Sequence, residues 1–189
     1  MTAIVFDTET TGLDEPEIIE SAWMGAKFRA EDENSDTLEL TYGIPVVKRF
    51  KPSKRISMGA MCTHHIMDED LRNEPPSSSF ALSQSVQYMI GHNVDFDWKA
   101  AGSPEHIQRI DTLSLARRYF PDCDSHKLGA LTYYINRNEA REELQSAHSA
   151  ETDILLTGAL LVAILTKTNV QVQDFETLWK LSEEARVRS

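Results

Sequence analysis

The sequence predicts an α/β protein whose mixed central β-sheet is flanked by α-helices. Two patterns support this fold class. The first third of the chain consists of strand-like segments joined by short turns, and the remainder alternates short apolar strands with helices. With 41% hydrophobic and 26% charged residues and no shift in composition, residues 1–189 are expected to form one domain with a full core.

Three strands are expected in the first third of the chain. Residues 4–6 belong to the first, residues 17–28 (EIIESAWMGAKF) form the second, and residues 37–50 (TLELTYGIPVVKRF) form the third. A turn that contains Gly12 and Pro16 separates the first two strands. This part of the chain is therefore expected to be a β-meander.

The remaining two thirds alternate strands and helices. In chain order we expect a helix over 80–88, strand-to-helix units over 88–101 and 109–120, and helices over 126–135, 148–167 and 170–189. Asp111 and Thr112 lie at the junction of the second unit, where a helix cap is expected. In the last helix, Phe175, Leu178 and Leu181 have helical spacing, so this helix should pack against the body of the protein.

The sequence predicts a cytoplasmic protein without a membrane span. The chain starts directly with strand sequence and lacks the basic region and hydrophobic core of a signal peptide. Its longest apolar run, residues 154–165, contains Thr157 and is shorter than the about 20 residues that a bilayer requires. Cys62 and Cys123 stand in no zinc or disulfide pattern, which fits a reducing compartment.

The charge pattern is uneven. A net charge of -11 argues against a protein that coats nucleic acid nonspecifically, because phosphate binding needs a positive surface. It does not exclude an enzyme that acts on nucleic acid, since metal ions neutralise a carboxylate site. Residues 31–36 (EDENSD) are interpreted as solvated acidic surface. The basic run at residues 48–55 (KRFKPSKR) is left open between solvated surface and a contact with substrate.

Asp7 and Glu9 follow the apolar residues of the first strand. Side chains in a strand repeat every two residues, so these two carboxylates face the same side of the sheet. Neighbouring carboxylates repel and raise each other's pKa unless a cation lies between them or they end in water. A divalent metal ion is therefore the first hypothesis, and a solvated strand end is the alternative.

Three more residues complete the candidate site. Asp97 lies in the first turns of a helix, and Asp153 is the last charge before the apolar part of another helix, where burial without a partner is costly. His148 shares a target with Asp153 only if it lies in the loop or cap before that helix. Ser146 or Ser149 would supply the cap. Taken singly, Asp97 also fits an acid that complements the helix dipole, and His148 fits a surface histidine.

Considered together, these residues place carboxylates at two strand ends and one helix start, with an imidazole nearby. Oxygen ligands select hard cations, Mg²⁺ or Mn²⁺, over zinc. Four carboxylates can hold two such ions about 4 Å apart, which suits phosphodiester cleavage, and a histidine would take the proton from the attacking water. The histidines without metal-binding spacing are left outside the metal site: His64, His65, His92, His106 and His126.

Three motifs occur in order along the chain: FDTETTGL at residues 6–13, HNVDFD at 92–97 and HSAETD at 148–153. They resemble the motifs of the DnaQ-like, or DEDDh, 3′-5′ exonucleases, a family with an RNase H-like fold, and the last fits its pattern of a histidine, four residues and an aspartate. The likeness runs from about Ile4 to Lys167. Within the family, AMCTHHI at residues 60–66 is most similar to the exonuclease X branch.

The resemblance implies a role for each matching residue. The metal-binding acids would be Asp7, Glu9, Asp97 and Asp153. The general base would be His148. Thr11 and Leu13 would contact the terminal nucleotide, with Leu13 against its base, and His64 would lie close to the substrate. Asn93 is expected to be structural. Asp95 adds an acid to the second motif and is treated as solvated.

For function, the resemblance implies a 3′-5′ exodeoxyribonuclease that uses two Mg²⁺ ions, with Mn²⁺ as a substitute. Such an enzyme releases nucleoside 5′-monophosphates from DNA 3′ ends, preferably single-stranded, in DNA repair. An exoribonuclease of the RNase T or oligoribonuclease kind is an alternative, because backbone groups can contact a 2′-hydroxyl. A noncatalytic module that docks on a partner is a further alternative, which the five intact catalytic positions disfavour. The oligomeric state, a homodimer included, is left open.

Overall fold

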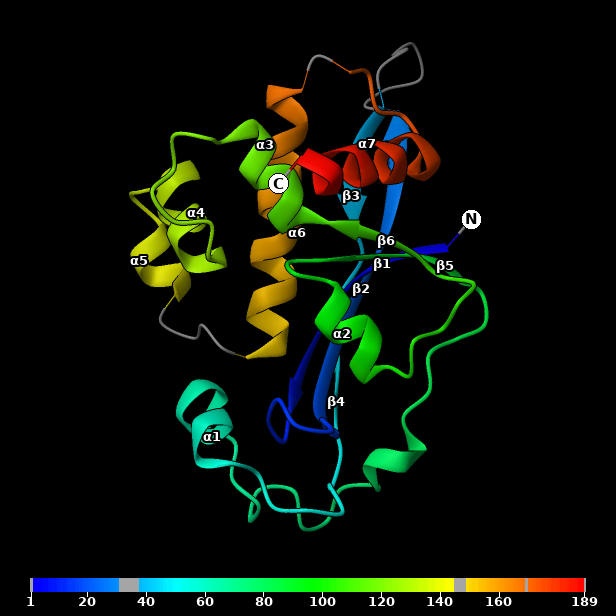
Figure 1. Cartoon of the computed structure of the whole chain (residues 1–189), viewed down its shortest axis with the longest axis vertical. Coiled ribbons are helices and arrows are strands. Elements are labelled where there is room, and N and C mark those ends of the chain that lie inside the picture. Colours follow the sequence, from blue (N-terminus) through cyan, green and yellow to red (C-terminus); the bar gives the residue numbers. More distant parts are fainter. Residues whose placement is uncertain (1, 31–37, 145–148, 169, 189) are drawn as a thin grey trace.

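The computed structural model describes residues 2–30, 38–144, 149–168 and 170–188, and in them helices flank a mixed β-sheet (Figure 1). The fold class expected from the sequence is confirmed. The strands are β1 Thr2–Thr10, β2 Ile18–Ala30, β3 Leu38–Tyr42, β4 Val46–Arg49, β5 Val86–Gly91 and β6 Gln108–Asp111. The helices are α1 Met58–His64, α2 Asp95–Ala100, α3 Thr112–Tyr119, α4 Leu128–Ile135, α5 Ala140–Glu143, α6 Ala150–Lys167 and α7 Phe175–Arg188, and a 3₁₀ turn covers Ser77–Ser79.

β1 lies at the centre of the sheet, whose order is β3-β2-β1-β5-β6, with β4 also paired to β2. It is antiparallel to β2 and parallel to β5, which is parallel to β6. The first half of the sheet is thus the expected meander, whereas each strand of the parallel half leads into a helix. β1 is the strand at which the two halves meet.

The third strand expected from the sequence is divided into two. β3 pairs with the end of β2 and β4 pairs with its beginning, so that both lie along the same edge of this long strand. The break lies at residues 43–45, between the two strands. Pro45 has no N–H to donate to a ladder, which explains why continuous pairing ends there.

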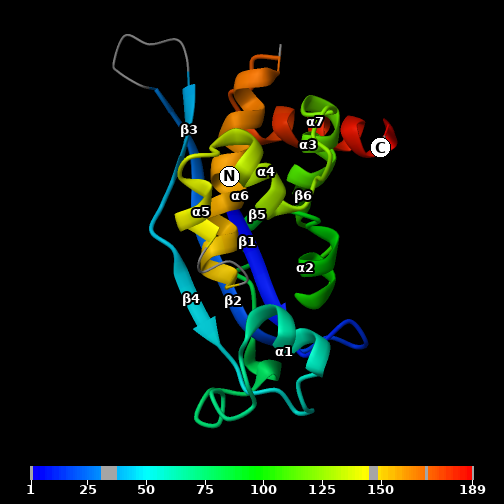
Figure 2. The ribbon, with the colours of Figure 1, turned by 90° about the vertical axis from the view of Figure 1, so that its left-hand side faces the viewer.

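Two hydrophobic cores lie on opposite faces of the sheet. Ala3 and Val5 of β1 pack with residues of α3, α6 and α7, whereas Ile4 and Phe6 pack with residues at and around α2. This division follows the alternation of side chains along a strand. Figure 2 shows α3 and α7 next to each other, above α2. Each residue further along β1 is therefore directed either toward α6 or toward α2.

The helix expected over residues 80–88 is wrong. The chain is irregular after Phe80 and forms β5 from Val86 onward. Phe80 and Leu82 pack against the core near α2, and β5 is covered on both faces. A short apolar run fits a helix or a buried strand equally well, so periodicity did not separate the two. The last helix, α7, begins at Phe175, five residues later than expected.

α6 makes a close approach to the sheet at Gly158. The Tyr42 hydroxyl donates a hydrogen bond to the Gly158 carbonyl (2.9 Å), and a Cβ at this position would lie 2.7 Å from Met24 Cε. The apolar run at residues 154–165 lies within α6 and is largely buried, and none of the helices described is long and apolar enough to cross a membrane. Glycine is what allows this helix to contact the sheet so closely.

We expect Gly158→Val to lower the free energy of unfolding by about 1–3 kcal/mol, the usual cost of overpacking. The added side chain meets the end of the buried Met24 side chain and the Tyr42 ring, so these side chains or α6 have to shift. Denaturant unfolding measures the change. Gly59→Ala is the control, because nothing lies within 4 Å of a Cβ added there. If Gly158→Val were as stable as the wild type, the close approach would not be a constraint on the fold.

Candidate metal centre

Three carboxylates meet at the end of β1. Asp7 and Glu9 lie on β1, and Asp153 lies in the first turn of α6. A carboxylate oxygen from each of the three lies within 4.8 Å of one from each of the others. Asp7 and Glu9 continue the alternation of Val5, which packs in the core beneath α6, so the strand directs both carboxylates toward this helix. The structure thus brings together three of the four predicted acids.

The start of α6 determines the position of Asp153. Ser149 is the N-cap residue, and its Oγ accepts a hydrogen bond from the Thr152 N–H (3.3 Å). The Asp153 N–H donates to the Ser149 carbonyl (3.0 Å), so the carboxylate lies at the positive end of the helix dipole. Ser146, the other expected cap, and His148, the predicted general base, lie outside the described residues.

Asp97 reaches the same strand from α2, on the other face of the sheet. Its Oδ1 accepts hydrogen bonds from the Thr8 N–H (2.9 Å) and the Thr8 hydroxyl (2.7 Å), and the residue is 4% exposed. Thr8 stands between Asp7 and Glu9 in the sequence and has the opposite orientation on the strand. Asp97 is therefore fixed beside the three clustered carboxylates rather than within their cluster.

Burial and mutual repulsion raise the pKa values of these acids. Burial raises the pKa of Asp7 well above its usual value, and the charges of Asp97 and Asp153 raise it further. Burial, followed by the charges of Asp153 and Glu20, raises the pKa of Glu9 to about 8. Burial raises the pKa of Asp97 to about 7, against the opposing effect of its hydrogen bonds. Without a cation, the site therefore retains protons at neutral pH.

The donor set fits a divalent ion. The clustered side chains offer carboxylate oxygens, which hard cations such as Mg²⁺ and Mn²⁺ prefer. Such an ion would displace the shared protons and remove the repulsion among the acids. The same three residues, Asp7, Glu9 and Asp153, were singled out from the sequence on this chemistry. Their roles as metal ligands stay a prediction.

Glu20 is a buried acid of the site that the sequence pattern did not reveal. It lies opposite Glu9 on β2 and is 2% exposed. Its Oε2 accepts from Arg49 Nε (2.7 Å), and its Oε1 accepts from the Ala150 N–H at the start of α6 (3.2 Å). A charged residue between Ile19 and Ser21 in an apolar strand was the available signal. Glu20 thus links β4, β2 and the helix that carries Asp153.

The predicted substrate residues Thr11, Leu13 and His64 line one cavity of about 750 Å³ that also includes Glu9. Leu13 is 88% exposed, so its side chain is open to solvent where it lines this cavity. Thr11 is buried, and its N–H donates to the carbonyl of Glu17 (3.0 Å). Its backbone N–H is therefore already engaged in holding the turn after β1.

His64 is held by contacts on both ring nitrogens. Its Nδ1 accepts a hydrogen bond from the Ile66 N–H (3.0 Å), and its Nε2 lies 3.3 Å from the Thr10 carbonyl. This pattern corresponds to a neutral ring that donates from Nε2. Burial also lowers its pKa. His64 thus joins α1 to the end of β1 and forms a wall of the cavity.

A second cavity, of about 860 Å³, is lined in part by Asp153. Its lining includes Asp153, the turn residue Asn93 and the side chains of Arg117 and Lys127. The first cavity includes Glu9 and, from the basic run, Lys54 and Arg55. Glu9 therefore lines one cavity and Asp153 lines the other, and the lining of each cavity also includes basic residues.

The basic run at residues 48–55 has more than one role. Arg49 binds the buried Glu20, and Lys54 Nζ donates to the carbonyls of Asp14 (2.9 Å) and Glu15. Arg49 therefore contacts the acid next to the carboxylate cluster, and Lys54 holds the turn beside Leu13. Arg55 lines the first cavity and is exposed.

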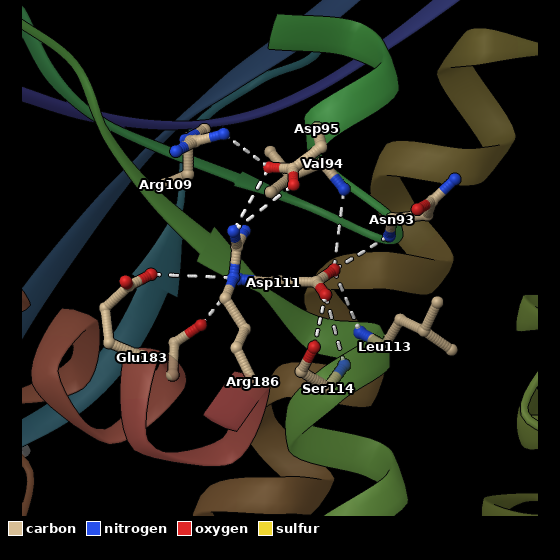
Figure 3. Close-up of polar contacts among 10 residues, drawn as sticks. Asn93, Val94, Asp95, Arg109, Asp111, Leu113, Ser114, Glu183 and Arg186 are labelled. Carbon is tan, nitrogen blue, oxygen red and sulfur yellow. Dashed lines mark hydrogen bonds and ion pairs between the residues drawn. The ribbon is translucent and has the colours of Figure 1, made fainter. Parts of the chain in front are cut away.

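Asp95 is not simply solvated, so this expectation is corrected. Its Oδ1 accepts from Arg109 Nη1 (2.7 Å) and Arg186 Nη1 (3.1 Å), as Figure 3 shows. The side chain is 45% exposed. The partners come from β6 and α7, and the packing of α7 beside β6 brings Arg186 to the start of α2.

Comparisons with known proteins identify an exonuclease family model, similar DNA polymerases and similar solved exonuclease structures. A family model for exonucleases, named RNase T, matches residues 4–161. The chain is 28% identical over 195 residues to a PolC-type DNA polymerase III from Streptococcus suis and 28% identical over 183 residues to one from Bacillus cereus. These matches cover 97% and 87% of this chain but 12% and 11% of the polymerases, so the chain spans about a tenth of their length.

Solved structures show the same fold. Exonuclease X in complex with 5′ overhanging duplex DNA matches with a TM-score of 0.67 and 25% identity over 95% of this chain and 99% of that chain. Exonuclease I of E. coli in complex with a 5cy-dA13 oligonucleotide matches with a TM-score of 0.68 and 18% identity over 95% of this chain and 42% of that chain. The expected RNase H-like fold is confirmed.

In metal-free buffer, we expect stability to fall as the pH rises from about 4.5 to about 8. Glu9 titrates near 8 when folded, against 4.5 ordinarily, so in this window the unfolded chain has lost a proton that the folded protein still binds. Glu9→Gln removes this proton-binding site and should be more stable than the wild type by about 1–3 kcal/mol at pH 8 in EDTA.

Chemical denaturation at a series of pH values measures this difference. Glu151→Gln is the matched control, because Glu151 is an exposed acid in the first turn of α6 and should not change the pH dependence. A Glu9→Gln variant with the pH dependence of the wild type would contradict the raised pKa of Glu9.

Glu20→Ala should lower the free energy of unfolding by about 1–3 kcal/mol, since it leaves the buried Ala150 N–H without its acceptor. Glu20→Gln retains an oxygen at this place and should lose less, although it also loses the charge that binds Arg49. Thermal or denaturant unfolding compares the two variants. Equal losses would mean that the contact with Ala150 contributes nothing.

Proposed function

Because the chain belongs to the RNase T exonuclease family, with the motifs of its DnaQ-like members, we propose that it hydrolyses DNA from the 3′ end and releases nucleoside 5′-monophosphates. The cluster formed by the carboxylates of Asp7, Glu9 and Asp153 carries this proposal. Support for DNA as the substrate comes from the structural match to exonuclease X in complex with DNA, which extends over nearly the whole of both chains.

Asp7, Glu9, Asp97 and Asp153 would hold two divalent ions, Mg²⁺ or in its place Mn²⁺. Bound there, the ions supply activation of the attacking water and stabilisation of the leaving oxygen. The protein's own contribution is to hold the four acids in place: β1 presents two of them, α6 presents Asp153, and Thr8 fixes the Asp97 carboxylate with two hydrogen bonds. Acids held in this way need no rearrangement when the ions bind.

His148 is the general base of the proposal. It directly precedes Ser149, the residue that caps α6, and so stands five positions before Asp153 in the sequence. A neutral imidazole accepts the proton of the attacking water, and its ordinary pKa suits a reaction near pH 7. The acids, whose charges are neutralised by metal ions, are then left to bind rather than to transfer protons.

The two cavities suggest how a strand lies across the site. The 3′-terminal nucleotide would occupy the cavity lined by Thr11, Leu13 and His64, with the exposed Leu13 side chain against the base. Arg117 and Lys127 in the second cavity would bind phosphates further along the strand. The scissile phosphate would then lie over the carboxylates between the cavities. A single strand fits this path because its terminal base is free to leave the stack.

The decisive experiment is digestion of a DNA and an RNA oligonucleotide of one sequence, each labelled at its 5′ end. With Mg²⁺ or Mn²⁺ we expect a ladder that shortens from the 3′ end of DNA, and with EDTA no ladder. Asp7→Asn and Asp153→Asn should reduce the rate by about 10³-fold or more, because each removes a charge on which metal binding depends. Glu151→Gln, an exposed acid beside Thr152, should retain the wild-type rate.

The outcomes separate the alternatives. A faster ladder on RNA would show an exoribonuclease with the same centre. No ladder on either substrate, with binding of DNA intact, would favour a noncatalytic docking module and contradict the proposal. Retained activity in Asp7→Asn would contradict the assignment of the metal ligands.

A further inference from the structure

We propose that the C-terminal helix α7 helps to position the proposed metal centre. Arg186 of α7 and Arg109 of β6 both form ion pairs with Asp95. These ion pairs fix α2, the short helix that carries Asp97. Arg186 and Arg109 are thus positioning residues. The inference rests on the proposed function, because it takes Asp97 as a metal ligand. It adds to that function a part of the chain that lies outside the three sequence motifs.

α2 depends on contacts outside itself. It has only six residues, Asp95–Ala100, and its N-cap residue Val94 makes no side-chain capping bond. A helix this short has little stability of its own. On its inner side, Asp97 binds Thr8 of β1. The orientation of Asp97 therefore also depends on the contacts that the side of the helix with Asp95 makes.

Two arginines hold the side of α2 with Asp95 (Figure 3). Arg109 Nη1 donates to Asp95 Oδ1 (2.7 Å), and its guanidinium lies 4.3 Å from the centre of the Trp98 ring, so it contacts both the first and the second turn of α2. Arg186 Nη1 lies 3.1 Å from Asp95 Oδ1 and 3.4 Å from its Oδ2. The Arg186 side chain is 19% exposed, which shields the pair from solvent more than an ordinary surface ion pair.

The backbone that leads into α2 is tied to α7 by a second route. The Asp111 Oδ1 accepts from the N–H groups of Asn93 (2.9 Å) and Val94 (3.4 Å), where Asn93 has a φ of 67°. The N–H of Asp111 itself donates to Ser182 Oγ on α7 (2.8 Å). α7 is therefore linked to the entrance of α2 through Ser182 and to its first turn through Arg186.

The geometry gives α2 fixed points on both sides. Thr8 holds Asp97 from the strand, and Arg186 holds Asp95 two residues earlier from α7. Without Arg186, one cation remains on Asp95, and the first turn of α2 is held less firmly against α7. A displaced Asp97 carboxylate binds metal less well, whereas Thr11 and Leu13 of the cavity proposed for the terminal nucleotide lie outside α2.

The test compares Arg186→Met with Arg118→Met. The control removes the ion pair between Arg118 of α3 and Glu184 (3.3 Å), which also anchors α7 but does not touch α2. We expect Arg186→Met to speed hydrogen exchange of the α2 amides in metal-free buffer and to raise the Mn²⁺ concentration for half-maximal activity about 10-fold, with a smaller change in KM for the oligonucleotide. Arg118→Met should change neither, and Arg186→Lys should restore part of the metal affinity.

Several outcomes decide the matter. Equal α2 exchange and equal Mn²⁺ dependence in the two methionine variants would overturn the inference. If Arg186→Met does not fold, Asp95→Asn removes the same ion pairs from the other side and should give the same rise in Mn²⁺ requirement; a wild-type requirement in this variant would overturn the inference. A wild-type protein without metal-dependent activity or metal-induced thermal stabilisation would instead refute the proposed function, whatever the exchange of α2 shows.

Discussion

Repulsion among closely placed carboxylates is the constraint on which the rest of the structure depends. Carboxylate oxygens of Asp7, Glu9 and Asp153 lie within 4.8 Å of one another, and burial, followed by repulsion from Asp153, raises the pKa of Glu9 to about 8. Such a cluster opposes folding, so the two cores on either side of β1 must supply the stability that offsets it. The repulsion is concentrated where a bound cation would relieve it, which is typical of a site selected for binding rather than for stability.

The supporting contacts around the acids show how the protein keeps them in place. Thr8 uses both its N–H and its hydroxyl on Asp97, and Arg49 neutralises Glu20 beside the cluster. Each of these partners lies on or next to the central strands rather than in a loop. Groups placed on a sheet in this way move little when a ligand binds, which favours a preorganised centre.

Much of this arrangement was predictable from the sequence, because it follows from local periodicity. The two-residue repeat of a strand places Asp7 and Glu9 on one face, and the apolar run after Asp153 marks a helix. The roles that depend on distant partners were not predictable. Asp95 looked solvated because its partner Arg186 stands 91 residues away, and Glu20 gave no sign of its contact with Ala150, 130 residues away. The helix expected at residues 80–88 failed because short apolar runs do not distinguish a helix from a buried strand.

The long separations along the chain also determine when, during synthesis, the carboxylate cluster can form. Thr8 and Asp97 are 89 residues apart, and Glu20 and Ala150 are 130 residues apart. During synthesis the N-terminal part of a chain emerges first, so β1 is present well before α6 and α7 are made. A nascent chain that ends before α6 contains Asp7 and Glu9 but not Asp153. The cluster of three carboxylates therefore forms only late in synthesis, and incomplete chains do not carry it.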